Sequence, residues 1–89
     1  MTRIQIETIS ILIRTRPLLI RNAFGYTQEH VAECLKIGQT TYSRWDNGAM
    51  PFRLENIDKL AAVYGLSFEE FFGDLNLIEK KGQEARKLK

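Results

Sequence analysis

The sequence predicts an all-α fold of five helices, preceded by an isoleucine-rich N-terminal arm. Three observations support this prediction. Apolar residues recur at helical spacing in successive segments, small polar residues stand where helices would begin, and glycines stand where they would end. The chain has 89 residues, 44% of them hydrophobic, which suits one small domain with a single core.

The N-terminal arm, residues 1–15, favours a β-strand. Its isoleucines alternate with other residues in two stretches, Ile4 and Ile6, then Ile9, Ile11 and Ile13. Isoleucine is β-branched and has a high strand propensity, so we expect a strand with one break in register. A helix remains open as an alternative, because Ile6, Ile9 and Ile13 also follow three- and four-residue spacing.

The central domain is expected at residues 16–73 and should open with a helix over about 16–24. Pro17 suits the first turn of that helix, where a backbone N–H has no helical partner in any case. Gly25 suits its end.

Two short helices joined by a tight turn should follow. Thr27 can cap the first of them, and its apolar positions are Val31, Ala32 and Leu35. The segment 36–38, Lys-Ile-Gly, breaks this run. The second helix is expected over about 39–47, with Gly48 as a left-handed C-terminal residue. This is the arrangement of a helix-turn-helix, whose second helix fills the major groove of DNA with polar side chains.

Two more helices complete the predicted domain. A loop at 49–53, with Pro51, leads to an amphipathic helix over 54–64. Ser67 and Glu70 form a capping box that opens a last short helix through Phe72. We expect residues 74–89 to form a charged tail, partly disordered beyond Lys80.

Bulk properties agree with a DNA-binding protein without proving one. The net charge is only +2, but residues 1–25 carry +3 while residues 54–73 carry −3, so the charge distribution allows a basic face away from the acidic segment. A single cysteine indicates a reducing cytoplasm. Polar residues interrupt the N-terminal apolar run, which excludes a signal peptide or membrane span there.

The order Thr-Gln-x-x-Val-Ala, a turn, then x-Thr-x-Tyr-Ser-x-Trp-Asp-Asn-Gly runs from Thr27 to Gly48. This pattern resembles the Xre family of phage repressors, Cro proteins and bacterial one-domain regulators, over about residues 17–72. The resemblance implies a lambda repressor-like fold in a bacterial or phage protein that binds a palindromic operator, usually as a dimer. The chain departs from the pattern at Lys36, where the turn often has Gly, and at Gly38, where Ser or Thr usually caps the helix.

Base readout is assigned to four polar residues of the second helix of the pair. Gln39 and Thr40 stand at its N-terminus, which projects deepest into the groove, and Ser43 and Arg44 follow one turn later. Glutamine pairs with adenine, threonine contacts a thymine methyl group, and arginine binds guanine or a phosphate. We expect Tyr42 and Trp45 to pack inward instead.

Phosphate contacts are expected from Gln28, Asn47 and Arg53. Gln28 opens the first helix of the pair, which in the family that this chain resembles abuts the DNA backbone, so the resemblance implies a phosphate contact beside the free N–H groups of that helix. Asn47 and Arg53 follow the second helix, and loop capping is the alternative role for both. The resemblance further implies a structural salt bridge between Arg21 and Asp46.

We find no pattern for a metal site, a cofactor or catalysis. His30 and Cys34 have an i, i+4 spacing, but two ligands do not make a zinc site and the chain has no other Cys or His. No nucleophile with a base, Gly-rich phosphate loop or carboxylate pair is evident. We therefore expect a non-enzyme.

Two functions remain open: a homodimeric repressor-type regulator that binds double-stranded DNA, and an antitoxin or adaptor whose main partner is another protein, such as a toxin. The polar residues of the second helix favour the first. For dimerisation, we expect the arm to pair with its twofold mate as a two-stranded ribbon. The alternative interface lies around the last helix, with Phe68, Phe71 and Phe72.

Overall fold

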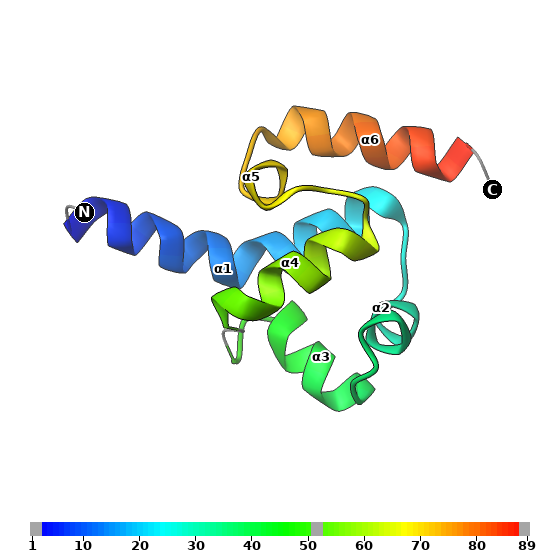
Figure 1. Ribbon diagram of the computed structural model, residues 1–89, viewed down its shortest axis with the longest axis horizontal. Coiled ribbons are helices and arrows are strands. Elements are labelled where there is room, and N and C mark those ends of the chain that lie inside the picture. Colours follow the sequence, from blue (N-terminus) through cyan, green and yellow to red (C-terminus); the bar gives the residue numbers. More distant parts are fainter. Residues whose placement is uncertain (1–2, 51–52, 88–89) are drawn as a thin grey trace.

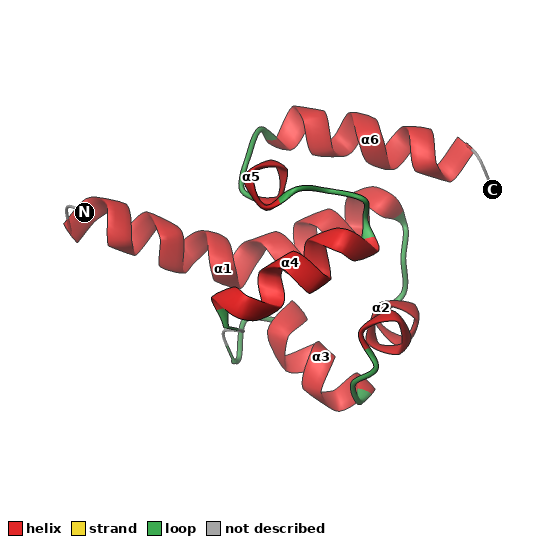
Figure 2. Ribbon diagram, viewed as in Figure 1, coloured by secondary structure: helices red, strands yellow, loops and turns green. Residues whose placement is uncertain are grey.

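The computed structural model describes residues 3–50 and 53–87, and this part of the chain contains six helices and no strand (Figure 1, Figure 2). The helices are α1 (Arg3–Phe24), α2 (Gln28–Leu35), α3 (Gln39–Asp46), α4 (Leu54–Val63), α5 (Phe68–Phe71) and α6 (Leu75–Lys87). The all-α class is therefore confirmed. Pro51, expected in the loop before α4, lies outside the described residues.

The N-terminal arm is helical, so the strand favoured for it is wrong. Residues 3–14 and the helix expected at 16–24 together form α1, and the helical alternative is the one that the chain adopts. Ile20 and Phe24 of this helix are buried in the core, and Ile13 is partly buried and packs against the core cluster. Packing of that face outweighs the strand propensity of isoleucine, because propensity is a weaker term than burial.

Pro17 lies inside α1 and not in a first turn. Proline has no backbone N–H, so the Ile13 carbonyl lacks the hydrogen bond that it would accept from position 17 in a regular helix. The helix nevertheless continues, and Pro17 is completely buried. One turn earlier, the Thr15 hydroxyl donates to the Ile11 carbonyl at 2.9 Å. Burial of the ring thus offsets the missing backbone hydrogen bond.

The charged tail also differs from the expectation of partial disorder, because residues 75–87 form α6. Ile78 and Gly82 are buried, and Ala85 continues their row at helical spacing. Ahead of the helix, the Asp74 carboxylate accepts a hydrogen bond from the Asn76 N–H at 2.8 Å. A narrow row of small and apolar residues is sufficient to dock an otherwise polar helix.

One core joins all six helices. Its fully buried side chains come from each of them: Ile20, Val31, Tyr42, Ile57, Leu60, Phe71 and Ile78. The apolar row predicted for 54–64 is confirmed at its described positions, because Ile57, Leu60, Ala61 and Tyr64 are all buried. Helix α6 lies on one side of α1, and α2 and α3 lie on the other (Figure 1). None of the described helices has the length and apolar character needed to cross a membrane.

Candidate nucleic-acid interface

The turn between α2 and α3 is closed by backbone geometry. Thr27 caps α2, and its hydroxyl accepts a hydrogen bond from the His30 N–H at 3.0 Å. Lys36 ends the helix in the left-handed region, at φ 59°, which directs the chain into the turn. Gly38 stands at the N-cap of α3 with no side-chain hydrogen bond. Ile37, between them, packs against the core and fixes the two helices together.

Asp46 anchors the C-terminal end of α3 to the rest of the domain. Its carboxylate is 2% exposed and forms an ion pair with Arg21 of α1, with Oδ1 at 2.8 Å from Nε and Oδ2 at 3.1 Å from the terminal guanidinium nitrogen. The Gln28 amide donates to Oδ2 at 3.1 Å, and the Tyr42 hydroxyl donates to Oδ1 at 3.0 Å. Four hydrogen bonds thus meet at one carboxylate, and three of them connect α3 to α1 and α2. Arg21 also donates to the Tyr26 carbonyl at 2.9 Å, which fixes the chain entering α2.

Electrostatics within this group favour the ion pair. The hydrogen bond to Asp46 raises the pKa of the Arg21 guanidinium above its usual range. Burial is the main cause that raises the pKa of Tyr42 beyond the physiological range. Arg21 therefore stays charged and Tyr42 stays neutral, so both donate to Asp46 at every pH at which the protein would work.

Five polar residues border one shallow hollow on the surface of the helix pair. Its volume is about 320 Å³, and it is lined by Gln28, Gln39, Thr40, Ser43 and Arg44. Gln39, Thr40 and Arg44 are exposed, and Ser43 and Gln28 are partly exposed. The structure therefore brings the four residues assigned to base readout onto one face, with Gln28 beside them. No described side chain from another element enters this hollow.

The other residues expected to contact phosphate lie outside the hollow. The Asn47 side-chain oxygen accepts a hydrogen bond from the Ala49 N–H at 2.9 Å, which closes the loop after α3. Arg53 is exposed and lies 3.6 Å from the Glu55 carboxylate. Loop capping, the alternative role that the sequence left open, thus describes the Asn47 contact.

The aromatic residues of α3 face the core. Tyr42 is completely buried, as expected, and Trp45 is partly buried against the core with its ring at 6.4 Å from the Tyr42 ring. Sequence reasoning did not foresee that Tyr42 and Gln28 bind Asp46. The i, i+4 spacing of Tyr42 and Asp46 on α3 is the signal that could have indicated the first of these contacts.

His30 and Cys34 lie side by side on α2 without further ligands. The Cys34 sulfur is 3.7 Å from His30 Nε2, and both residues are exposed. Among the described residues, no group of three or more His, Cys, Asp or Glu side chains could hold a metal ion.

Helices α2 and α3 and the turn between them lie in a segment that matches a known protein family. A family described as Helix-turn-helix matches residues 19–71, which is more than half of the chain. The chain belongs to this family. It includes the Xre, Cro and C1-type proteins, so the family resemblance seen in the sequence is confirmed, and its members are DNA-binding regulators.

A curated relative supports the same assignment. The cryptic phage CTXphi transcriptional repressor RstR of Vibrio cholerae is 34% identical over 61 residues, which cover 66% of this chain and 55% of RstR. The matched region thus spans little more than half the length of that relative. No solved structure matches the chain significantly.

Proposed function

We propose that this helix-turn-helix protein is a transcriptional regulator of the repressor type that binds a palindromic double-stranded DNA operator as a homodimer. Family membership and the similarity to a phage repressor support regulation by DNA binding. The observation that carries the proposal is the hollow lined by Gln39, Thr40, Ser43, Arg44 and Gln28, because a single face of α3 presents all four base-reading candidates.

The chemistry of these side chains suits base edges in the major groove. Gln39 can pair with the N6 and N7 atoms of adenine, and Thr40 can contact a thymine methyl group. Arg44, further along α3, can bind guanine or a phosphate. A mixture of amide, hydroxyl and guanidinium groups can recognise a base sequence, whereas positive charge alone would only attract the phosphate backbone.

Asp46 gives this surface its rigidity. Its two hydrogen bonds with Arg21 and one with Gln28 hold α3 against α1 and α2, so the exposed side chains project from a fixed helix. Gln28 has two roles in the proposal. Its amide nitrogen donates to Asp46, and its place at the start of α2 lets the free N–H groups of that helix bind a phosphate.

The test is selection of bound duplexes from a random DNA pool at physiological salt. Wild-type protein should enrich a palindromic motif, and the Gln39→Ala, Thr40→Ala double variant should lose or relax the preference at specific positions of each half-site. The matched control is Gln83→Ala, Glu84→Ala, an equally polar and exposed pair on α6, which should select the wild-type motif. Binding should also weaken steeply as salt rises, because phosphate contacts release counterions.

Two outcomes would contradict the proposal. If the wild-type protein enriches no sequence, the chain does not read DNA, and a pull-down for a protein partner such as a toxin becomes the next experiment. If the double variant selects the same motif as wild type, Gln39 and Thr40 do not read bases.

A further inference from the structure

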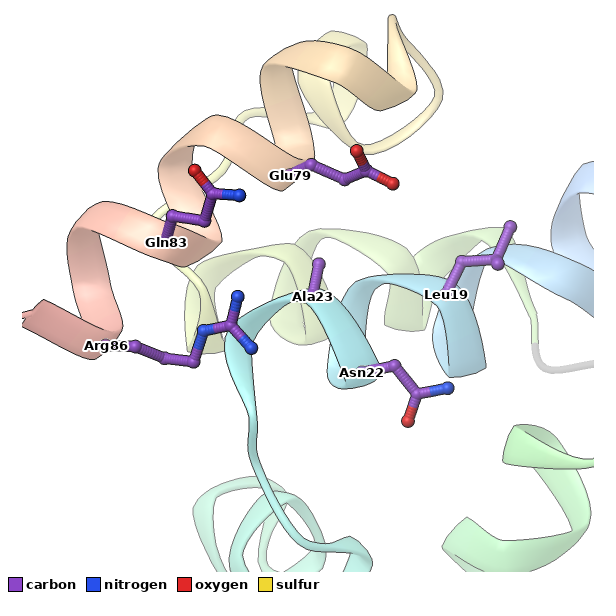
Figure 3. A pocket seen from close by; sticks show the side chains of 6 residues that line it. All are labelled: Leu19, Asn22, Ala23, Glu79, Gln83 and Arg86. Atoms are coloured by element: carbon purple, nitrogen blue, oxygen red, sulfur yellow. The ribbon is translucent and has the colours of Figure 1, made fainter.

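The C-terminal part of helix α1 is covered on three of its sides. Its core side carries the buried Ile20 and Phe24. On a second side α6 packs closely, since a Cβ atom on Gly82 would lie 2.3 Å from the Ala23 carbonyl oxygen. A shallow groove with a volume of about 290 Å³ lies between these two helices. Figure 3 shows the side chains that line it: Leu19, Asn22, Ala23, Glu79, Gln83 and Arg86.

Helix α3, the proposed recognition helix, and the loop after it occupy the third side. Arg21 of α1 binds Asp46 at the end of α3, and Gly48 comes so close to α1 that an added Cβ would lie 3.6 Å from the Arg14 carbonyl oxygen. Helices α6 and α3 therefore flank α1 from opposite directions, as Figure 1 also shows.

The fourth side of α1 exposes apolar side chains. Ile11 is 60% exposed and Leu18 is 37% exposed. They stand seven residues apart, about two helical turns, so they share one line along the helix. Position 4, another seven residues earlier, also carries isoleucine. We call positions 4, 11 and 18 the α1 stripe. It extends onto the N-terminal half of α1, which projects beyond the other helices (Figure 1).

We infer that a second copy of this chain docks on the α1 stripe, with the two α1 helices packed antiparallel about a twofold axis beside Ile11. This inference rests on the proposed function, because a palindromic operator requires a twofold protein. It replaces the β-ribbon expected for the arm with a pair of helices.

The spacing of the α1 stripe lets it pack against the same stripe of a second copy. Its three positions are symmetric about position 11, so an antiparallel pair places Ile11 against Ile11 and position 4 against Leu18. In that register, position 7 of one copy and position 14 of the other are offset by one residue, about 1.5 Å along the helix axes. They carry Glu and Arg, whose charges are complementary.

The direction of the axis suits DNA binding. For two antiparallel helices in contact, the twofold axis is perpendicular both to the helices and to the line between them. In this molecule that direction runs from the α6 side of α1 to the α3 side. Both recognition helices therefore face the same way, while both copies of α6 lie on the far side.

The distance between the two copies of α3 also suits DNA binding. Arg21, which holds Asp46, follows Ile11 by ten residues, or about 15 Å at the rise of an α-helix. An axis beside Ile11 therefore separates the two copies of Arg21 by about 30 Å along the helices. Half-sites one turn of DNA apart are separated by about 34 Å.

Disulfide crosslinking tests the register directly. A residue beside a twofold axis meets its own copy, so Ile11→Cys in a Cys34→Ser background should form a covalent dimer under mild oxidation. Replacing Cys34 removes the free thiol of the native chain. Leu77→Cys in the same background is the control, because Leu77 is also an exposed apolar residue but lies on α6, away from the stripe, and this variant should stay monomeric under denaturing conditions.

Light scattering tests the interface without crosslinking. Wild type should have the mass of two chains and Ile11→Glu the mass of one, while Leu77→Glu should remain a dimer. Ile11 is too exposed for this change to disturb the core, and an unchanged circular dichroism spectrum will verify that. A monomeric wild type, or an Ile11→Glu variant that remains a dimer, would overturn the inference.

The inference and the proposed function can fail separately. If Ile11→Cys crosslinks but no duplex is selected, the interface stands and DNA reading fails. If duplexes are selected but Ile11→Glu still has the mass of a dimer, DNA reading stands and another interface forms the dimer.

Discussion

Asp46 is the residue on which the candidate interface depends. A buried carboxylate is stable only if its partners replace the water that it loses, and here Arg21, Gln28 and Tyr42 do so. Removing the carboxylate would take away the acceptor that Arg21, Gln28 and the buried Tyr42 hydroxyl share, and would leave Arg21 only its hydrogen bond to the Tyr26 carbonyl.

We expect Asp46→Ala to lower the free energy of unfolding by roughly 3 kcal/mol, the typical cost of breaking a buried ion pair. Urea denaturation monitored by Trp45 fluorescence would measure it. Glu55→Ala is the control, because the Arg53–Glu55 pair is exposed (83% and 71%) and should contribute less than about 1 kcal/mol. Equal effects of the two substitutions would show that Asp46 has no special role.

Lys36 is the residue at which the backbone of the turn is least favourable. Its φ of 59° is left-handed, where a Cβ atom costs about 1 kcal/mol or more relative to glycine. We expect Lys36→Gly to raise the free energy of unfolding by roughly 0.5–1 kcal/mol, since the gain is partly offset by the greater flexibility of unfolded glycine.

Lys36→Ala separates backbone geometry from charge in that experiment. Alanine has the same Cβ atom, so it should not stabilise the protein. A gain for alanine equal to that for glycine would assign the effect to the lost lysine charge.

Individual side-chain roles were the part of the site that the sequence predicted least completely. The motif placed Gln39, Thr40, Ser43 and Arg44 on one helix, and helical spacing put them on one face. The hydrogen bond from Gln28 to Asp46 was not predictable, because it joins residues 18 apart in sequence and depends on how α2 crosses α3.

Among the elements, α6 shows how a small residue sets a helix contact. Gly82 lets the α6 backbone reach the Ala23 carbonyl, and a Cβ atom there would be 2.3 Å from that oxygen. We expect Gly82→Ala to push α6 away from α1 and to destabilise the protein by about 1–3 kcal/mol, despite the better helix propensity of alanine. Thermal unfolding of Glu84→Ala, an exposed site on the same helix, is the control and should change little. A stabilised Gly82→Ala protein would show that the close approach is absent.

The link between α5 and α6 should make stability depend on pH. Glu70 closes the capping box with Ser67 and forms an ion pair with Lys81 of α6. The Lys81 hydrogen bond, and then the Ser67 backbone hydrogen bond, lower the pKa of Glu70 below its ordinary value of 4.5. A carboxyl group with a lowered pKa stabilises the folded state above its ordinary pKa, and this contribution is lost as the pH falls through the folded value.

Glu70→Gln should therefore lose less stability than wild type on acidification below pH 4.5. Glutamine keeps the capping box but cannot form the ion pair. Melting temperatures measured across this range would show it, and Lys81→Met should flatten the same part of the curve. If the melting temperature of Glu70→Gln falls as steeply with acidification as that of wild type, Glu70 is not the cause of the pH dependence.

Element prediction succeeded where local signals and burial agreed. Capping residues and apolar rows located α2, α3, α4 and α5. It failed for α1 and α6, for a different reason in each. In α1, strand propensity and Pro17 both argued against one long helix, and packing outweighed them. In α6, a charged composition concealed the row of Ile78, Gly82 and Ala85.

At the scale of the whole molecule, α1 connects the fold to the proposed function. Its core side supports the domain, Arg21 positions α3 through Asp46, and its exposed stripe is the surface proposed to bind a second copy. Dimerisation through α1 would set the spacing of the recognition helices directly, because no flexible linker intervenes. Sequence patterns could not predict this role, since the arm first had to be identified as a helix.

The measurement that tests this account most directly is the affinity of the protein for its selected duplex when the distance between the two half-sites is changed. Two α3 helices on a rigid twofold pair require half-sites on the same face of the DNA. We predict that inserting half a helical turn of DNA reduces the affinity to that of a single half-site. An affinity unaffected by the insertion would contradict the claim that a rigid pair of recognition helices reads the operator.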